Sequence, residues 1–212
     1  MIGSKIAKAF AIVLHPLLMP LYATWLILNS GSYLSFATSP VLQKFIYLVV
    51  FISTTVFPGL GAWSLLKQGK IGSIEMPVRE DRHWPFIVTL VCYIASVFLL
   101  LKLPIPRIFA FMVGGGLLSI LWAFFVNLKW KVSIHMMGIG GLMGLMFGFA
   151  QIYHVNMVLT LMLIAVLAGI LGWARLKRKA HTPSQVYVGF LGGFLIEFTY
   201  IWFFVKDIIV VL

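Results

Sequence analysis

PFIVTLVCYIASVFLLLKLPIPRIFAFMVGGGLLSILWAFFV, residues 85–126, decides the fold, because its only charged side chains are Lys102 and Arg107 at a short break. Neither half alternates apolar and polar residues as a half-exposed strand would. A bilayer core about 30 Å thick takes roughly 20 apolar residues per helix. The stretch therefore predicts two membrane helices joined by KLPIP.

Similar apolar stretches run through the rest of the chain. They lie at residues 6–28, 41–66, 85–101, 105–126, 133–152, 155–173 and 184–205. With 62% hydrophobic residues and a mean hydropathy of +1.06, the 212 residues leave no room for a soluble domain. We expect an all-α fold, a polytopic transmembrane helix bundle forming one membrane-embedded domain over residues 1–212. About seven spans are expected, or six if the stretch 85–101 or 105–126 does not cross fully.

The chain is strongly basic, with 16 Lys and Arg against five Asp and Glu. A soluble protein of this charge would suggest nucleic acid binding, but loops this short offer no basic surface able to follow a phosphate backbone. With seven spans most basic residues share one face, which the positive-inside rule assigns to the cytoplasm. Basic residues that bind phosphate would produce the same charge bias between the two faces, so the side of the membrane on which this face lies stays open. The single cysteine, Cys92, lies in an apolar run and predicts no internal disulfide.

Small residues and prolines predict local features of the bundle. Glycines recur with small-xxx-small spacing at Gly140, Gly144, Gly148, Gly189 and Gly193. This spacing favours close helix contact. Pro16 and Pro20 predict a kink in the first span.

Three polar clusters fall on the one face that seven spans define. They are REDRHWP at 79–85, KWKVSIH at 129–135 and ARLKRKAHTPSQ at 174–185. Each directly precedes an apolar stretch, so each lies at the N-terminal end of a membrane helix, where free N–H groups and the helix dipole favour an anion. Together with the arginines and lysines, these ends predict a phosphate site.

The last cluster carries a spacing typical of one enzyme family. Arg175, LKRKA, His181, TPS and Gln185 repeat the pattern of an Arg, five residues, a His, three residues and then an acid, just before a helix. In this the chain resembles the type-2 phosphatidic acid phosphatase superfamily, in its integral membrane lipid phosphatase branch, as a divergent member. The resemblance covers about residues 75–195.

The other two signatures of that family are matched less fully. Its Pro-Ser-Gly-His corresponds to VSIH, which contributes Ser133 and His135. Its Lys, six residues and Arg-Pro are matched loosely by EMPVREDRHWP, where Glu75 replaces the Lys if Arg82 is the Arg, and Pro85 follows three residues later.

The resemblance implies a division of work between two histidines. His181 would be the nucleophile that forms a phosphohistidine, and His135 the general acid for the leaving oxygen, both within the range of an imidazole near neutral pH. The groups expected to contact the phosphate are Arg175, Arg79, Arg82, Lys131, Ser133 and Gln185. No carboxylate–His cluster has metal-ligand spacing, so neither a metal nor another cofactor is expected.

Gln185 departs from the family, which has Asp at this place. A Gln accepts the same hydrogen bond from the nucleophilic His but supplies no charge, and the analogous neutralisation in a serine-protease triad costs about 10⁴ in rate. Gln185 also fits N3 of a capping box, with Thr182 as N-cap and Pro183 as N1. Orientation of His181 and capping of the last helix both remain open.

The resulting expectation is a metal-independent lipid phosphate phosphatase acting on a phospholipid or polyprenyl (di)phosphate, in the bacterial inner membrane. Membrane lipids and the lipid phosphate are the expected partners, and the oligomeric state is open. One alternative is a noncatalytic protein of the same fold that binds or transports a lipid phosphate. Another is an ion channel or transporter, for which Glu197, deep in the last stretch, is the main polar candidate. His15, beside Pro16, is interpreted as a partner of the kink.

Overall fold

The computed structural model describes residues 2–205, and within this range every regular element is a helix. In chain order the elements are α1 (Ile2–Val13), η1 (Pro16–Leu18), α2 (Met19–Leu28), α3 (Tyr33–Ala37), α4 (Pro40–Phe51), the π-helix η2 (Ile52–Val56), α5 (Phe57–Lys67), η3 (Glu80–Arg82), α6 (His83–Lys102), α7 (Ile108–Asn127), α8 (Ile134–Tyr153), α9 (Val158–Lys177), α10 (Pro183–Tyr200) and the π-helix η4 (Ile201–Val205). The prediction of an all-α fold is confirmed.

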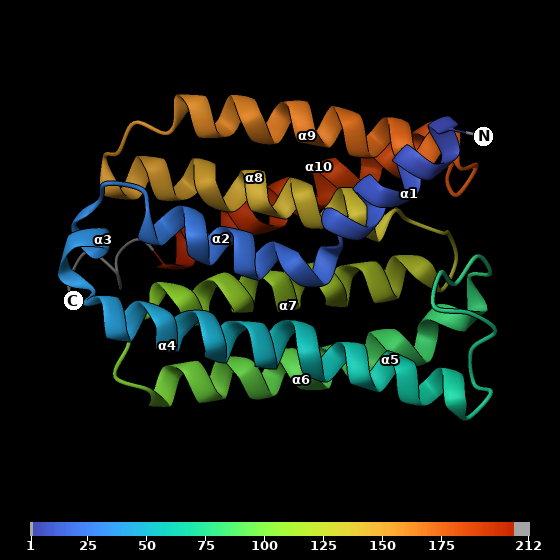
Figure 1. The fold of residues 1–212 in the computed structure, drawn as a ribbon, viewed down its shortest axis with the longest axis horizontal. Helices are drawn as coiled ribbons and strands as arrows, with labels where there is room; N and C mark the ends of the chain where they lie inside the picture. Colours follow the sequence, from blue (N-terminus) through green and yellow to red (C-terminus); the bar gives the residue numbers. More distant parts are fainter. Residues whose placement is uncertain (1, 206–212) are drawn as a thin grey trace.

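Seven helical segments of the described chain are long and apolar enough to cross a membrane, as predicted. They are Gly3–Leu28, Pro40–Lys67, Glu80–Lys102, Ile108–Asn127, Ile134–Tyr153, Val158–Lys177 and Pro183–Phe203. The long helices run lengthwise through the bundle, and the N-terminus lies at the same end as the starts of α6, α8 and α10 (Figure 1). The chain is a multi-pass membrane protein whose three polar clusters meet at one end.

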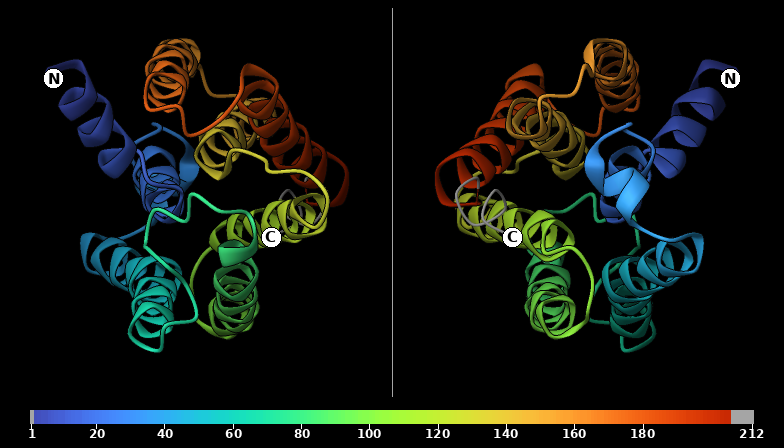
Figure 2. Two further views of the ribbon diagram at one scale, coloured as in Figure 1. Left: turned by 90° about the vertical axis from the view of Figure 1, so that its right-hand side faces the viewer. Right: turned by 90° about the vertical axis from the view of Figure 1, so that its left-hand side faces the viewer.

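The first span is broken where Pro16 and Pro20 predicted a kink. Helix α1 ends at Val13, η1 makes one tight turn, and the Nδ1 of His15 accepts the N–H of Leu17 at 3.3 Å. Beyond the break α1 leans away from the centre of the bundle and packs against α9 (Figure 2).

The second span contains a π-helical turn that the sequence did not predict. Pro58 has no N–H to give to Thr54, and its ring would collide with that carbonyl in a regular helix. The chain widens one turn earlier, where the N–H of Phe57 bonds to the carbonyl of Ile52.

Helices α8 and α10 form the closest helix pair, with backbone against backbone. A Cβ at Gly140 or Gly144 would collide with the carbonyl of Phe190 or Phe194 on α10. A Cβ at Gly193 would collide with the carbonyl of Met137 on α8. The close contact predicted from the glycine spacing is confirmed, and it fixes how the two helix starts lie relative to each other.

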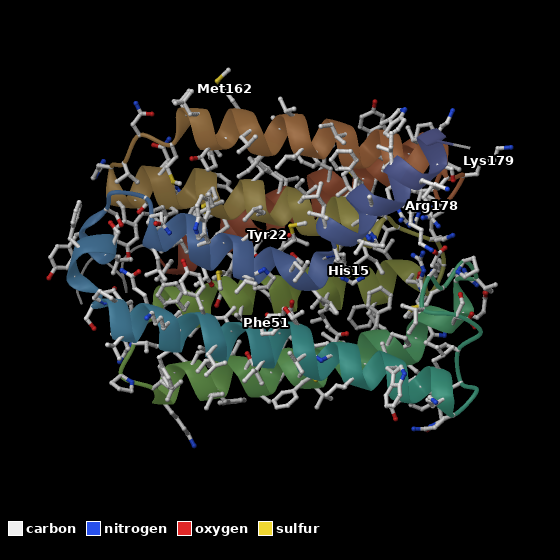
Figure 3. The ribbon with its side chains drawn as sticks, in the orientation of Figure 1. His15, Tyr22, Phe51, Met162, Arg178 and Lys179 are labelled. Carbon is white, nitrogen blue, oxygen red and sulfur yellow. The ribbon has the colours of Figure 1, made fainter. Side chains whose placement is uncertain are left out.

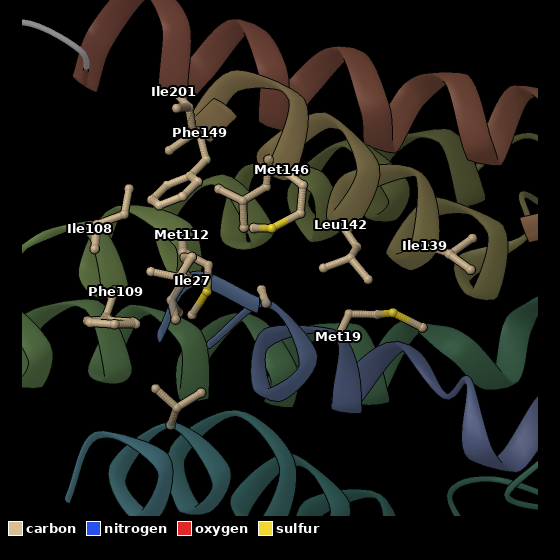
Figure 4. Close-up of a cluster of buried hydrophobic side chains, with 14 of the residues drawn as sticks. Met19, Ile27, Ile108, Phe109, Met112, Ile139, Leu142, Met146, Phe149 and Ile201 are labelled. Carbon is tan, nitrogen blue, oxygen red and sulfur yellow. The ribbon is translucent and has the colours of Figure 1, made fainter. Parts of the chain in front are cut away.

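The apolar core fills the space between α2, α7, α8 and α10. Figure 4 shows Ile27 of α2, Met112 of α7 and Met146 and Phe149 of α8 packed together, all at most 3% exposed. A second, smaller apolar cluster of Phe86, Ala123, Val132 and Met137 lies near the starts of α6 and α8, so apolar packing also supports the end that holds the polar clusters.

Candidate functional site

Hydrogen bonds tie the three polar clusters together at one end of the bundle. Lys131 donates its Nζ–H groups to the carbonyls of Pro77, at 2.8 Å, and Ala180, at 3.0 Å. Arg82 donates from one Nη to the carbonyl of Val132 at 3.0 Å. The loop before α6, the loop before α8 and the loop before α10 therefore form one structure.

Beneath this structure lies a cavity of about 320 Å³ that Arg82, Arg175, His135 and His181 all line. Arg82 is 4% exposed and Arg175 is 9% exposed. Arg82 bonds only to backbone carbonyls, and the Nε of Arg175 has no hydrogen-bond partner. Two buried guanidinium groups therefore reach the cavity without donating a hydrogen bond to a carboxylate of the described residues.

His181 is held in one orientation by Gln185. The Oε1 of Gln185 lies 3.0 Å from Nδ1 of His181 and also accepts the N–H of Thr182 at 3.2 Å. Since Oε1 accepts from that N–H, it is an acceptor toward His181 as well, so Nδ1 carries the proton and Nε2 carries the lone pair. Thr182 and Gln185 also complete the capping box of α10. The two roles left open for Gln185 occur together.

The electrostatic surroundings keep His181 neutral. Burial lowers its pKa to about 3, and the charges of Arg82, Arg175 and Lys131 also lower it, whereas the hydrogen bond that His181 donates to Gln185 raises it. Burial, and then the charges of Arg82 and Arg175, also lower the pKa of Lys131. The positive charges of the site are not fully balanced by negative groups, and a bound anion would balance them.

His135 begins α8 and lines the same cavity from another side. Its Nε2 lies 3.0 Å from the carbonyl of Ala11 on α1 and donates to it, since a carbonyl oxygen can only accept. The ring of His15 stands edge-on to it, with centroids 5.2 Å apart. The nitrogen of His135 that remains for proton transfer is Nδ1.

Two of the predicted residues occupy less direct positions. Ser133 stands at the N-cap position of α8, but its hydroxyl makes no capping bond and is buried without a partner, while its N–H donates to the carbonyl of Gln185 at 3.2 Å. Arg79 is not among the residues that line the cavity, and its guanidinium pairs with Glu80 at 2.9 Å on the surface. Of the two arginines in REDRHWP, Arg82 is the one that reaches the cavity.

Sequence reasoning did not assign two further cavity residues to the site. His15 was interpreted as a partner of the kink, and it both caps η1 and lines the cavity. Glu75 lines the cavity too, and it pairs with Arg178 at 2.8 Å and with Lys8 at 3.8 Å. Nothing in the sequence placed His15 in a cavity. Its neighbour Pro16 is sufficient to explain the helix break, so no further role for His15 was indicated.

Figure 3 shows how the polar side chains are distributed. Arg178 and Lys179 project at the end of the bundle that holds the three loops, and His15 lies deeper, toward the middle of the bundle. Met162 points outward from α9, where 61% of it is exposed, as a lipid-facing residue would.

The arrangement fits a tetrahedral oxyanion held by cations beside two imidazoles. The described residues contain no group of three or more His, Cys, Asp or Glu side chains placed to hold a metal ion. Comparison of the chain with protein families, with curated proteins and with solved structures finds no match. Its chemistry is therefore argued from the geometry of the cavity and from motif spacing.

Proposed function

We propose that this protein is a metal-independent lipid phosphate phosphatase that acts through a phosphohistidine. One observation carries the proposal: a neutral imidazole, His181, has its proton fixed on Nδ1 by Gln185 and lines the cavity together with the buried side chains of Arg82 and Arg175. An imidazole so oriented has a free lone pair on Nε2, which is what attack on phosphorus requires.

The cations supply the binding of the phosphate. Arg82 and Arg175 hold the nonbridging oxygens, and the ammonium of Lys131 adds charge from the loop above. The hydroxyl of Ser133 is buried without a partner at the start of α8, but Ser133 does not line the cavity, so it is not assigned a contact with the phosphate. Because the charge of the cations is fixed before the reaction, it stabilises the transition state without reorganisation.

The chemistry then follows from the two histidines. His135 enters the reaction as the imidazolium, with one proton on Nε2 held by the carbonyl of Ala11 and one on Nδ1, a charge that the bound phosphate dianion favours. Nε2 of His181 attacks phosphorus, the bond from phosphorus to the lipid oxygen breaks, and that oxygen takes the Nδ1 proton of His135. Water then attacks the phosphohistidine and gives one proton to Nδ1 of His135, which releases inorganic phosphate and returns His181 to its neutral form and His135 to the imidazolium. Gln185 accepts from Nδ1–H of His181 throughout and supplies orientation without charge.

The substrate is a lipid because the cavity lies within a bundle whose outer faces are apolar. By family resemblance the candidates are phosphatidic acid, phosphatidylglycerol phosphate and undecaprenyl diphosphate. The bacterial inner membrane is the location proposed on the same basis. Charge bias favours a cytoplasmic site, whereas familiar lipid phosphatases of this kind work on the other side.

The test is phosphate release from a panel of these lipids by detergent-purified protein. Release should persist in EDTA and disappear in His181→Asn. His154→Asn is the matched control, because His154 is exposed and lies in the left-handed region that Asn tolerates, with φ 51°. Release lost equally in both variants, or abolished by EDTA, would contradict the proposal.

A second function has one observation in its favour. Gln185 brings no negative charge to balance an imidazolium at His181, whose pKa is already low. A protein that binds the phosphate of a lipid, and carries or presents it without hydrolysis, would retain the cations and lose turnover. Tight binding of the lipids with no release from any of them would select this function.

A further inference from the structure

An ionisable side chain lies deep in the bundle, far from the phosphate site. Glu197 of α10 is 6% exposed, and its Oε2 has no hydrogen-bond partner. At a rise of about 1.5 Å per residue it lies about 21 Å along the helix from Pro183. Its carboxylate is therefore too deep to touch a phosphate held at the helix starts.

The cavity nevertheless reaches it. Glu197, Ser119 of α7 and Tyr93 of α6 all line the cavity that His181 lines at its other end. The hydroxyl of Ser119 is buried, and it too has no partner. Two unsatisfied polar groups from different helices thus face one space, which is uncommon unless a ligand or water satisfies them.

Glycines make room for this carboxylate. A Cβ at Gly115 of α7 would overlap the Glu197 carboxyl group, and one at Gly141 of α8 would lie 3.2 Å from its Cγ. The glycines of α7 and α8 thus leave space for the acidic side chain of α10. A bundle held together by apolar contacts alone would not need an acidic side chain at this place.

No fixed positive charge balances Glu197 within the described residues. Its titratable neighbours are Tyr93 of α6 and Tyr200 of α10. Helix α7 carries no charged side chain, and the titratable residues of α8 are His135, at the other end of the cavity, and Tyr153, the last residue of the helix, which does not line the cavity. A carboxyl group in such surroundings needs a proton or another cation.

We propose that Glu197 and Ser119 form a second binding site, at the inner end of the cavity, for a monovalent cation, either a proton or Na⁺, that arrives through the cavity. One carboxylate compensates one positive charge, and the hydroxyl of Ser119 supplies a second oxygen. A divalent ion would leave net charge in the bilayer. The site is independent of phosphatase chemistry, and it gives the cavity a cation end as well as an anion end.

Infrared spectroscopy of the reconstituted protein in D₂O tests this proposal. The carboxyl C=O band of Glu197 is assigned by its loss in Glu197→Gln, or by its shift in Glu197→Asp if the Gln variant does not fold. Its deuterium shift then reports exchange with water. Loss of the band on raising pH identifies the proton as the ligand, and its loss at constant pH in NaCl but not in choline chloride identifies Na⁺.

The path is tested with a blocked cavity. In a Cys92→Ser background, Ala62→Cys puts a thiol on the cavity wall of α5, and Leu60→Cys puts one on the lipid face of the same helix, where Leu60 is 54% exposed. A bulky methanethiosulfonate should abolish fast deuterium exchange at Glu197 in the first variant and leave it unchanged in the second. Exchange that is equally fast in both, or a band that neither pH nor Na⁺ alters, would overturn the proposal.

Discussion

Replacing Gln185 by Glu restores the charge that the family's Asp would supply, without changing the shape of the site. Glu occupies N3 of a capping box as well as Gln does, so the bond to Thr182 and the start of α10 should persist. The new carboxylate oxygen would stand where Oε1 stands now, 3.0 Å from Nδ1 of His181.

The size of the effect follows from this geometry. Unit charges centred about 4 Å apart attract by about 4 kcal/mol at an effective dielectric constant of about 20. Because one pKa unit corresponds to about 1.4 kcal/mol, the pKa of His181 should rise by about three units. It would move from about 3 in the present protein into the range of an ordinary imidazole. Phosphate release at pH 7 should increase by up to about 10⁴-fold, the loss that neutralisation causes in a serine-protease triad.

The assay is NMR titration of isotope-labelled histidine, together with the pH profile of phosphate release. In the variant the rate of phosphate release should fall as the pH drops below about 6, because His181 becomes protonated there. The present protein should show no such fall above about pH 4. Ser184→Glu is the control, because it adds the same charge to the first turn of α10 on an exposed residue. A His181 pKa that stays near 3 in Gln185→Glu, or rises equally in Ser184→Glu, would refute the reasoning.

Three other changes have defined outcomes. Arg82→Ala should lower kcat/KM for phosphate release by about 10²–10³, as loss of one fixed transition-state donor does. Arg79→Ala breaks only a surface ion pair, so it should lower the free energy of unfolding, measured by denaturation, by no more than about 1 kcal/mol. Lys131→Met should raise the pKa of His181 in the NMR titration, because it removes a positive charge, and should weaken phosphate binding measured by calorimetry. Gly140→Ala should destabilise the detergent-solubilised protein by about 1–3 kcal/mol in thermal unfolding, because the new Cβ overlaps a carbonyl of α10, and unchanged stability would mean that the helix pair is looser than described.

The number and positions of the spans could be predicted because a membrane helix needs roughly 20 apolar residues in a row, and stretches of this length are easily recognised in the sequence. The break at Pro16 followed from the missing N–H of proline. The π-helix η2 could not be predicted, because a π-helical turn in an apolar stretch has no sequence pattern that distinguishes it from a regular α-helical turn. The lean of α1 toward α9 depends on packing partners and not on its own residues.

The candidate site was predicted in its residue types and only partly in its geometry. Arg175 lies in the last turn of α9 and His181 in the loop that follows it, so the short spacing between them brings both side chains to the cavity. The choice between Arg79 and Arg82 could not be made, because which arginine points inward depends on the short turn η3. Glu197 was noted for its cost in a membrane, but that a cavity reaches it follows only from the packed structure.

The backbone contact between α8 and α10 also limits how the molecule can move. Because Gly140, Gly144 and Gly193 each lie directly against a backbone carbonyl, no layer of side chains separates the two helices, and they are expected to move as one rigid unit. His135 lies in the first turn of α8, and His181 lies in the loop just before α10. Helix α1 stands outside this rigid unit, beyond the broken segment at His15, and its Ala11 carbonyl holds His135. Entry of the proposed lipid substrate from the side is then expected to move α1 about that hinge and to release the ring of His135 in the same motion.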